Sequence, residues 1–119
     1  MNDIRISDMM QMQQTLYAAH KDKWSARSPQ NAREFMLFLM EELGEAVAIY
    51  KKKGNDAIMD DAAVRGHFCE EMADVLMYFT EILLCYGITP DEFSSAYIEK
   101  HCKNMGRNYI QEYQDKYET

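Results

Sequence analysis

The chain has 119 residues and a formal net charge of −7 at neutral pH, and both values limit what it can be. One domain fits within this length and would bury roughly two-thirds of the surface of the unfolded chain. The acidic balance argues against nucleic acid as a main partner, because binding a phosphate backbone requires lysines and arginines clustered on one face. Ten methionines and few runs of β-branched residues favour packed helices over sheet.

The three cysteines indicate a reducing compartment. Cys69, Cys85 and Cys102 show no CxxC spacing, and no signal-like segment precedes them, so we expect reduced thiols in a cytoplasmic protein. No apolar run reaches the roughly 18 residues that cross a bilayer, and we expect no membrane partner.

The first helix is predicted between Met9 and His20, where apolar residues recur at helical spacing. Residues 1–8 are polar, and we expect them to be frayed or extended. Trp24 follows the helix, and a single tryptophan at the foot of a helix is most simply interpreted as a partly buried packing residue.

A long helix is predicted from Pro29 to about Lys53, because a serine followed by proline, as at Ser28, is a typical helix start. Gly54 ends it. The three lysines before that glycine complement the negative end of the helix dipole, and attraction of a triphosphate is the alternative explanation for them.

Residues 55–64 are small and acidic without a clear period, so we expect a loop that could cover a site. A second long helix then begins between Asp60 and Arg65 and runs to Tyr86, where Gly87 closes it.

A last helix is predicted from Pro90 to about Lys103, opened by a capping box over residues 89–92. Residues 108–119 carry tyrosines at a spacing that suits a C-terminal arm on another subunit. Residues 35–40 are apolar on every side, which indicates a partner chain. We therefore predict a single all-α domain over residues 1–119, with four to five helices. Its four-helix-bundle-like core would be completed in a homodimer or homotetramer.

Two acidic motifs lie on the two long helices, Glu41-Glu42-Leu43-Gly44-Glu45 and Glu70-Glu71-Met72-Ala73-Asp74. Carboxylates at i and i+3 share one helix face, which pairs Glu42 with Glu45 and Glu71 with Asp74. A helical wheel places these pairs beside apolar residues, whereas Glu70 and Glu81 point elsewhere, as solvated acids should.

Four such acids would repel one another, because two charges about 4 Å apart cost roughly 4 kcal/mol at an effective dielectric constant near 20. Raised pKa values, basic partners or a hard divalent cation would relieve this repulsion. An all-oxygen cluster suits Mg²⁺, with Mn²⁺ as a substitute.

The motif EExxE is followed after a spacer of 25 residues by ExxD and further downstream by KNxxR. In these motifs the chain resembles the MazG-type all-α nucleoside triphosphate pyrophosphohydrolases over residues 35–107. The resemblance implies Mg²⁺-dependent cleavage of a (deoxy)nucleoside triphosphate to the monophosphate and pyrophosphate, in a house-cleaning role against non-standard nucleotides. The family often continues from the arginine of KNxxR into Tyr-Pro. Here Asn108-Tyr109-Ile110 lacks that proline, which leaves the path after Arg107 open.

The resemblance also implies roles for individual residues. The metal ligands would be Glu42, Glu45, Glu71 and Asp74. Glu41 would orient or deprotonate the attacking water, although its wheel position lies about 100° from that of Glu42. The substrate-binding residues would be Lys100, Lys103 and Arg107 for phosphate, Asn104 for base or ribose, and Tyr78, Trp24 and His20 for the base.

Two alternatives stay open. A phosphoribosyl-ATP pyrophosphohydrolase-like enzyme, from the same broad superfamily, would differ in its base pocket. A non-catalytic helical oligomer or nucleotide-binding module would use the acids to pair with Lys51, Lys100 or Lys103. The sequence identifies neither base nor sugar, nor the number of metal ions, nor whether two subunits share the pocket.

Overall fold

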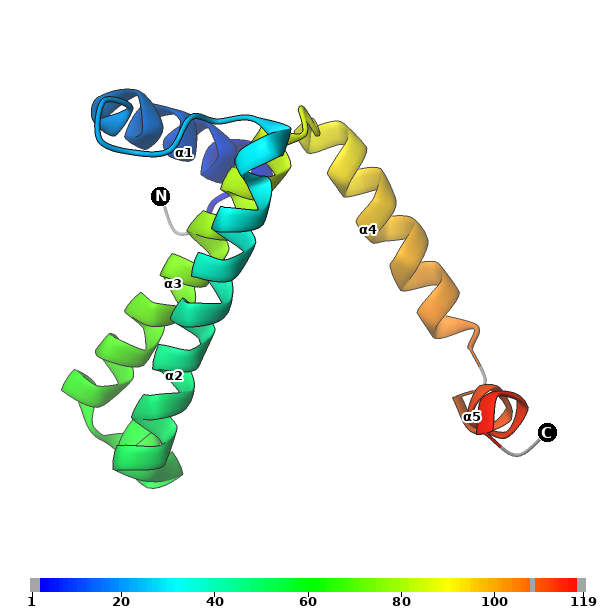
Figure 1. The fold of residues 1–119 in the computed structure, drawn as a ribbon. Coiled ribbons are helices and arrows are strands. Elements are labelled where there is room, and N and C mark those ends of the chain that lie inside the picture. The colour runs from blue at the N-terminus through cyan, green and yellow to red at the C-terminus, as the bar shows by residue number, and fades with distance from the viewer. Residues whose placement is uncertain (1–2, 108, 118–119) are drawn as a thin grey trace. The chain divides into compact units, whose positions relative to one another are not determined.

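The computed structural model of the chain describes residues 3–107 and 109–117, and over this range it confirms an all-α fold without strands. The elements in chain order are α1 (Ile6–His20), η1 (Pro29–Asn31), α2 (Ala32–Asp60), α3 (Ala62–Cys85), α4 (Pro90–Met105) and α5 (Tyr109–Tyr117) (Figure 1). The chain divides into two compact units, Met1–Thr89 and Pro90–Thr119, which are described separately. The prediction of one domain stays a prediction.

Within the described part of the chain, no single helix has the length and apolar character needed to cross a membrane. Helices α3 and α4 have the required length and apolar composition only when they are taken together, across the break between them.

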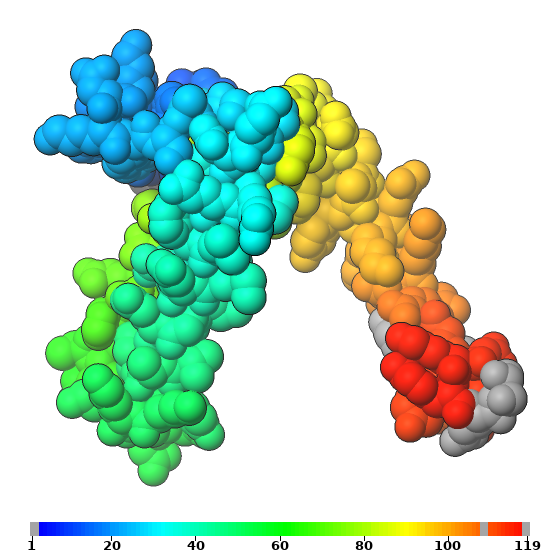
Figure 2. Space-filling view, viewed as in Figure 1, coloured from blue at the N-terminus to red at the C-terminus, as the bar shows by residue number. Residues whose placement is uncertain are grey.

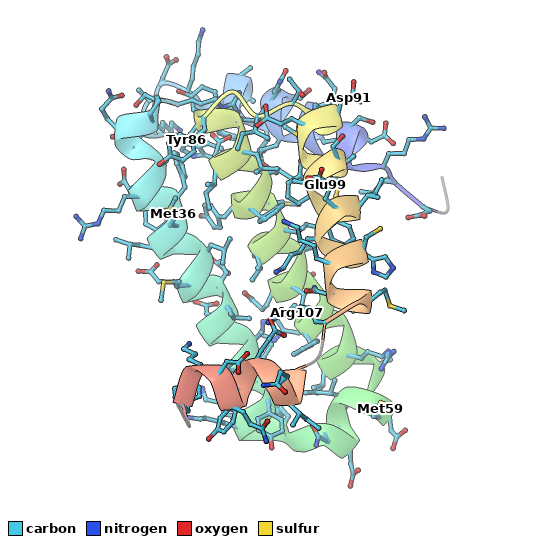
Figure 3. The ribbon with its side chains drawn as sticks, turned by 90° about the vertical axis from the view of Figure 1, so that its right-hand side faces the viewer. Met36, Met59, Tyr86, Asp91, Glu99 and Arg107 are labelled. Carbon is cyan, nitrogen blue, oxygen red and sulfur yellow. The ribbon has the colours of Figure 1, made fainter. Side chains whose placement is uncertain are left out.

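The first unit is built on a hairpin of α2 and α3, which run antiparallel and side by side (Figure 1). Met59 and Tyr86 mark its opposite ends (Figure 3). The turn between the helices is short because Asp61 caps α3: its carboxylate accepts hydrogen bonds from the backbone N–H groups of Ala63 (3.0 Å) and Val64 (3.3 Å). Helix α1 packs against α3.

Several predicted boundaries were wrong, for local reasons. Helix α1 begins at Ile6 rather than Met9, because Asp8 accepts a hydrogen bond from the backbone N–H of Arg5 (2.9 Å) and closes the first turn. The chain from Pro29 first forms the 3₁₀ turn η1, and Ser28 makes no side-chain capping bond.

Gly54 interrupts α2 as a kink instead of ending it. Its φ of 86° lies in the left-handed region that glycine adopts without strain, and the helix resumes beyond it as far as Asp60. The predicted loop over residues 55–64 was therefore wrong, since both sides of Asp61 are helical.

Aromatic side chains form the centre of the hairpin. Phe35 and Cys85 are buried, and Phe38, Tyr78 and Ile82 pack around them. The ring of Phe38 lies 6.3 Å from that of Phe35 and 5.7 Å from that of Tyr78, between centroids. The contact between Phe38 and Tyr78 joins α2 to α3, one helical turn from Glu42 and Asp74.

Glu81 corrects the sequence interpretation, which counted it among the solvated acids. Only 1% of Glu81 is exposed, and its Oε2 lies 2.8 Å from Nη2 of Arg27. The guanidinium group of Arg27 lies 4.3 Å above the ring of Tyr17, whose hydroxyl accepts a hydrogen bond from the backbone N–H of Arg27 (2.8 Å). One ion pair thus fastens the segment between α1 and α2 to α3.

Removing the arginine tests this ion pair. We expect Arg27→Ala to lower the free energy of unfolding by about 3 to 5 kcal/mol, because Glu81 would keep a buried and unpaired charge. Urea unfolding measures the loss, with the exposed Arg33→Ala as control. In the double variant Arg27→Met/Glu81→Leu most of the stability should return. A loss below about 1 kcal/mol in Arg27→Ala would contradict this role.

The second unit contains α4 and α5, and α4 buries none of its residues. Helix α4 ends at Met105, close to the predicted end. Arg107 then pairs with Glu112 of α5 (Nε to Oε2, 2.8 Å). The predicted C-terminal arm is helical over Tyr109–Tyr117, while residues 108, 118 and 119 lie outside the described range.

Helix α2 carries an apolar stripe on its exposed side. Its five members, each between 40% and 65% exposed, are Met36, Met40, Leu43, Val47 and Tyr50. They follow one another at intervals of four and three residues, the spacing of a coiled-coil seam. The helix lies at the surface along its length in the space-filling view (Figure 2).

We propose that a second copy of the chain covers this stripe, since two-fold symmetry lets one face pair with itself. Sedimentation should then show at least a dimer. The double variant Met40→Glu/Val47→Glu should sediment as a folded monomer, because charges would enter the seam. Met59→Glu, which places the same charge on an exposed methionine beyond the kink, should leave the dimer intact. A monomeric wild-type protein at micromolar concentration would exclude this pairing.

Candidate metal centre

Three carboxylates converge between α2 and α3. One oxygen each from Glu42, Glu45 and Glu71 lies within 4.8 Å of the other two. Glu42 and Glu45 are one helical turn apart on α2, and Glu71 faces them from α3. Glu71 is buried, Glu42 half-buried and Glu45 exposed, so the group runs from the interior of the hairpin to its surface.

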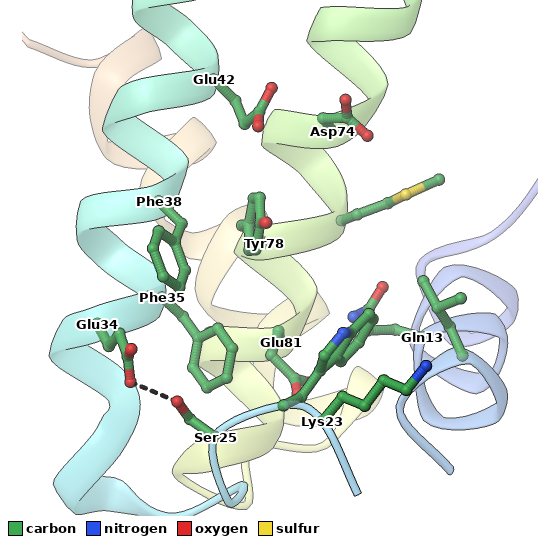
Figure 4. Close-up of a pocket in the computed structure, with 13 residues that line it drawn as sticks. Gln13, Lys23, Ser25, Glu34, Phe35, Phe38, Glu42, Asp74, Tyr78 and Glu81 are labelled. Carbon is green, nitrogen blue, oxygen red and sulfur yellow. Dashed lines mark hydrogen bonds between the residues drawn. The ribbon is translucent and has the colours of Figure 1, made fainter. Parts of the chain in front are cut away.

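Asp74, the fourth acid of the two motifs, stands outside this group. It lies across from Glu42 at one end of a cavity, which both residues line (Figure 4). Its negative charge is one of the causes that raise the pKa of Glu42. The structure therefore arranges the four acids as three that converge and one beside them.

The carboxyl of Glu42 is strongly perturbed. Its hydrogen bond with Glu71, its partial burial and the charges of Asp74, Glu45 and Glu71 raise the pKa of Glu42 to about 7. When both carboxyls are ionised neither has a proton to donate, and the buried Oε2 of Glu71 has no partner among the described residues. The hydrogen bond with Glu71 favours the protonated form of Glu42, since two ionised carboxylates cannot share one.

The other oxygen of Glu71 is satisfied. Oε1 lies 3.2 Å from Nε2 of His67, one turn earlier on α3. Glu71 is thus held at one oxygen, and its other oxygen is buried without a partner among the described residues. A divalent cation between these acids would replace the proton of Glu42, and an all-oxygen donor set matches Mg²⁺ or Mn²⁺. The side chains present therefore fit such an ion.

A cavity of about 480 Å³ extends from Glu42 and Asp74 towards α1 (Figure 4). Its aromatic walls are Trp24, Phe35, Phe38 and Tyr78. Its other lining residues are Gln13, Leu16, Lys23, Ser25, Glu34, Met77 and Glu81. Ser25 donates a hydrogen bond to Oε2 of Glu34 (2.7 Å), and Arg27 neutralises Glu81. The cavity thus has flat apolar walls, and its end opposite Glu42 and Asp74 is polar.

The three residues predicted to bind the base lie at or next to this cavity. Trp24 and Tyr78 line it, and His20 stacks on Trp24 with ring centroids 5.2 Å apart. Burial, followed by the charges of Glu42, Asp74 and Glu41, raises the pKa of Tyr78, so its hydroxyl stays neutral. Glu41 itself is exposed on α2 and is not one of the three converging acids.

The residues predicted to bind phosphate belong to the second unit. Lys100, Lys103 and Asn104 lie on α4, and Arg107 follows it. Arg107 donates hydrogen bonds to Glu112 and, from Nη1, to Oδ1 of Asn104 (3.2 Å). Their role towards a substrate remains a prediction.

The sequence interpretation missed three residues near the site that spacing could have indicated. Glu81 lies seven residues after Asp74, two turns along the same face of α3. His67 lies four residues before Glu71. Gln13, only 6% exposed, stands between Met10 and Leu16 at intervals of three. Glu81 and His67 thus recur in register with the acids of the second motif, and Gln13 with Met10, which is buried in the structure.

No protein-family model, no curated protein and no solved structure matches this chain. The resemblance to the MazG-type enzymes therefore rests on the sequence motifs alone.

The raised pKa of Glu42 predicts how stability changes with pH in the absence of metal. The folded protein binds more protons than the unfolded chain between pH 4.5 and about 7, so stability should fall as pH rises through this range. We expect a loss of about 1 kcal/mol, because solvent screens part of the shift.

Unfolding at pH 5 and pH 8 in a chelator measures this loss. Glu42→Gln should remove most of it, whereas the exposed Glu70→Gln should not. An unchanged pH dependence in Glu42→Gln would show that Glu42 is not the group that titrates.

Proposed function

We propose that this protein is a Mg²⁺-dependent pyrophosphohydrolase that cleaves a (deoxy)nucleoside triphosphate to the monophosphate and pyrophosphate. One observation carries the proposal: a buried carboxylate oxygen of Glu71 without a partner among the described residues, set among acids that open onto an aromatic cavity. A triphosphate and this acidic group, both negative, repel each other unless cations lie between them.

The acids supply the metal-binding part of the proposed activity. Glu42, Glu45 and Glu71 would hold Mg²⁺, and Asp74, which stands beside this group, is proposed as the fourth ligand. Bound Mg²⁺ would neutralise phosphate charge and activate a water. Glu42, whose pKa lies near 7, is suited to give up its proton at neutral pH when a cation binds.

The cavity supplies the nucleoside site. Trp24, Phe38 and Tyr78 offer flat apolar surfaces against which a base can stack, and its volume of about 480 Å³ suits a nucleoside. Gln13 and Ser25 provide polar atoms at its far end. Because Arg27 already neutralises Glu81, that carboxylate adds little repulsion.

The cellular setting belongs to the same proposal. We propose that the protein acts in the cytoplasm, because nucleotides are found there and the three cysteines are free thiols, as is usual in a reducing compartment. House-cleaning of non-standard nucleotides and a dimeric or tetrameric assembly complete the proposed description. The phosphate roles of Lys100, Lys103, Asn104 and Arg107 stay predictions from the sequence motifs.

Pyrophosphate release from a panel of nucleotides, with Mg²⁺ and with a chelator, tests the activity. We expect hydrolysis with Mg²⁺ only. Glu42→Gln and Glu71→Gln should each lower kcat/KM at least about 100-fold while the helical fold remains, because each removes a ligand and a repelling charge. Glu70→Gln, beside Glu71 but exposed, is the matched control.

Full activity in both variants would refute the metal assignment. Stabilisation by Mg²⁺ without cleavage of any nucleotide would favour a non-catalytic binding module. Selective cleavage of phosphoribosyl-ATP would favour the related enzyme.

A further inference from the structure

A second cavity, of about 510 Å³, lies on the other side of the acidic group. It is lined by residues of α2 and of the first turns of α3: Glu45, Ala48, Ile49, Lys52, Lys53, Ala63, Val64 and His67. Glu42 lines the aromatic cavity, and Glu45, one turn further along α2, lines this one. The converging acids therefore stand between two cavities.

The two cavities differ in charge. Glu34, Glu42, Asp74 and Glu81 line the aromatic cavity, with Lys23 as its basic residue. The second cavity is lined by Lys52 and Lys53, with Glu45 as its acid. Neither lysine side chain has a hydrogen bond or ion pair with any other described residue. Two uncommitted ammonium groups thus face a cavity that borders the metal-binding acids.

Cleavage at the α-phosphorus needs such a division. The water oxygen forms a bond to the α-phosphorus, and the bond from this phosphorus to the oxygen that bridges to the β-phosphorus breaks. The electron pair of that bond stays on the bridging oxygen, which leaves within pyrophosphate, and the proton lost by the water passes to a carboxylate and then to solvent. The nucleoside and the leaving group are attached to the reacting phosphorus through different oxygens, so each can occupy its own cavity beside the acids.

We propose that the second cavity binds the pyrophosphate part of the substrate, with Lys52 and Lys53 contacting the β- and γ-phosphates. This assignment rests on the proposed function. The aromatic cavity then holds the nucleoside, and the converging acids lie at the α-phosphate between them. The lysines offset the charge that develops on the leaving pyrophosphate, and they bind it as point charges without a fixed fork geometry.

The three consecutive lysines provide their own control, because Lys51 precedes the pair but does not line the cavity. Calorimetry with pyrophosphate and Mg²⁺ measures product binding without turnover. We expect Lys52→Gln/Lys53→Gln to weaken pyrophosphate binding about 10- to 100-fold and to leave binding of the nucleoside monophosphate unchanged. Lys51→Gln should bind both as the wild-type protein does. In the hydrolysis assay, the KM of the double variant for the triphosphate should be higher than that of the wild-type protein.

Three outcomes would overturn the assignment. Pyrophosphate binding in the double variant equal to that of Lys51→Gln would show that the lysines only complement the helix end. If the double variant weakened binding of the monophosphate as much as binding of pyrophosphate, the second cavity would not be specific for the pyrophosphate part. In both cases triphosphate hydrolysis by the wild-type protein keeps the proposed function. A wild-type protein that hydrolyses no triphosphate would overturn the proposed function and this assignment together.

Discussion

The repulsion among the carboxylates of Glu42, Glu45 and Glu71 is the constraint on which the site depends. The aromatic stack of Phe35, Phe38 and Tyr78 holds α2 against α3 and so keeps these acids together. Water screens the exposed Glu45 but not the buried Glu71. The two helices therefore pack more stably when something positive lies between the acids, and a proton on Glu42 is the smallest group that meets this requirement.

Two buried acids on α3, Glu81 and Glu71, differ in how far their carboxylate oxygens are paired. Glu81 is fully paired with Arg27, which ties the segment after α1 to the hairpin and closes one end of the aromatic cavity. Glu71 is paired at one oxygen with His67, and its other oxygen has no partner among the described residues. An unpaired buried oxygen costs stability, so its persistence beside two further acids favours a site that is completed by a ligand.

The sequence predicted the parts of this arrangement that depend on local periodicity. Helical spacing identified the two long helices, and the i, i+3 rule brought Glu42 together with Glu45. Features that depend on tertiary partners were missed: spacing puts Glu81 on the helix face of Asp74, but its pairing with Arg27, distant in sequence, could not be predicted. Asp74 shares a helix face with Glu71, yet it borders the cavity, since small differences in rotation separate neighbours on one face. The kink at Gly54 was taken as an end, because a glycine predicts a break in a helix but not whether the helix resumes beyond the break.

Proton release on metal binding tests the central claim most directly. Calorimetry of Mg²⁺ binding in buffers of different ionisation enthalpy counts the protons released. Since the pKa of Glu42 is raised to about 7, we predict that Mg²⁺ binding releases clearly more protons at pH 6 than at pH 8. Mg²⁺ binding without proton release at either pH, or no binding at all, would contradict a cation held by these carboxylates.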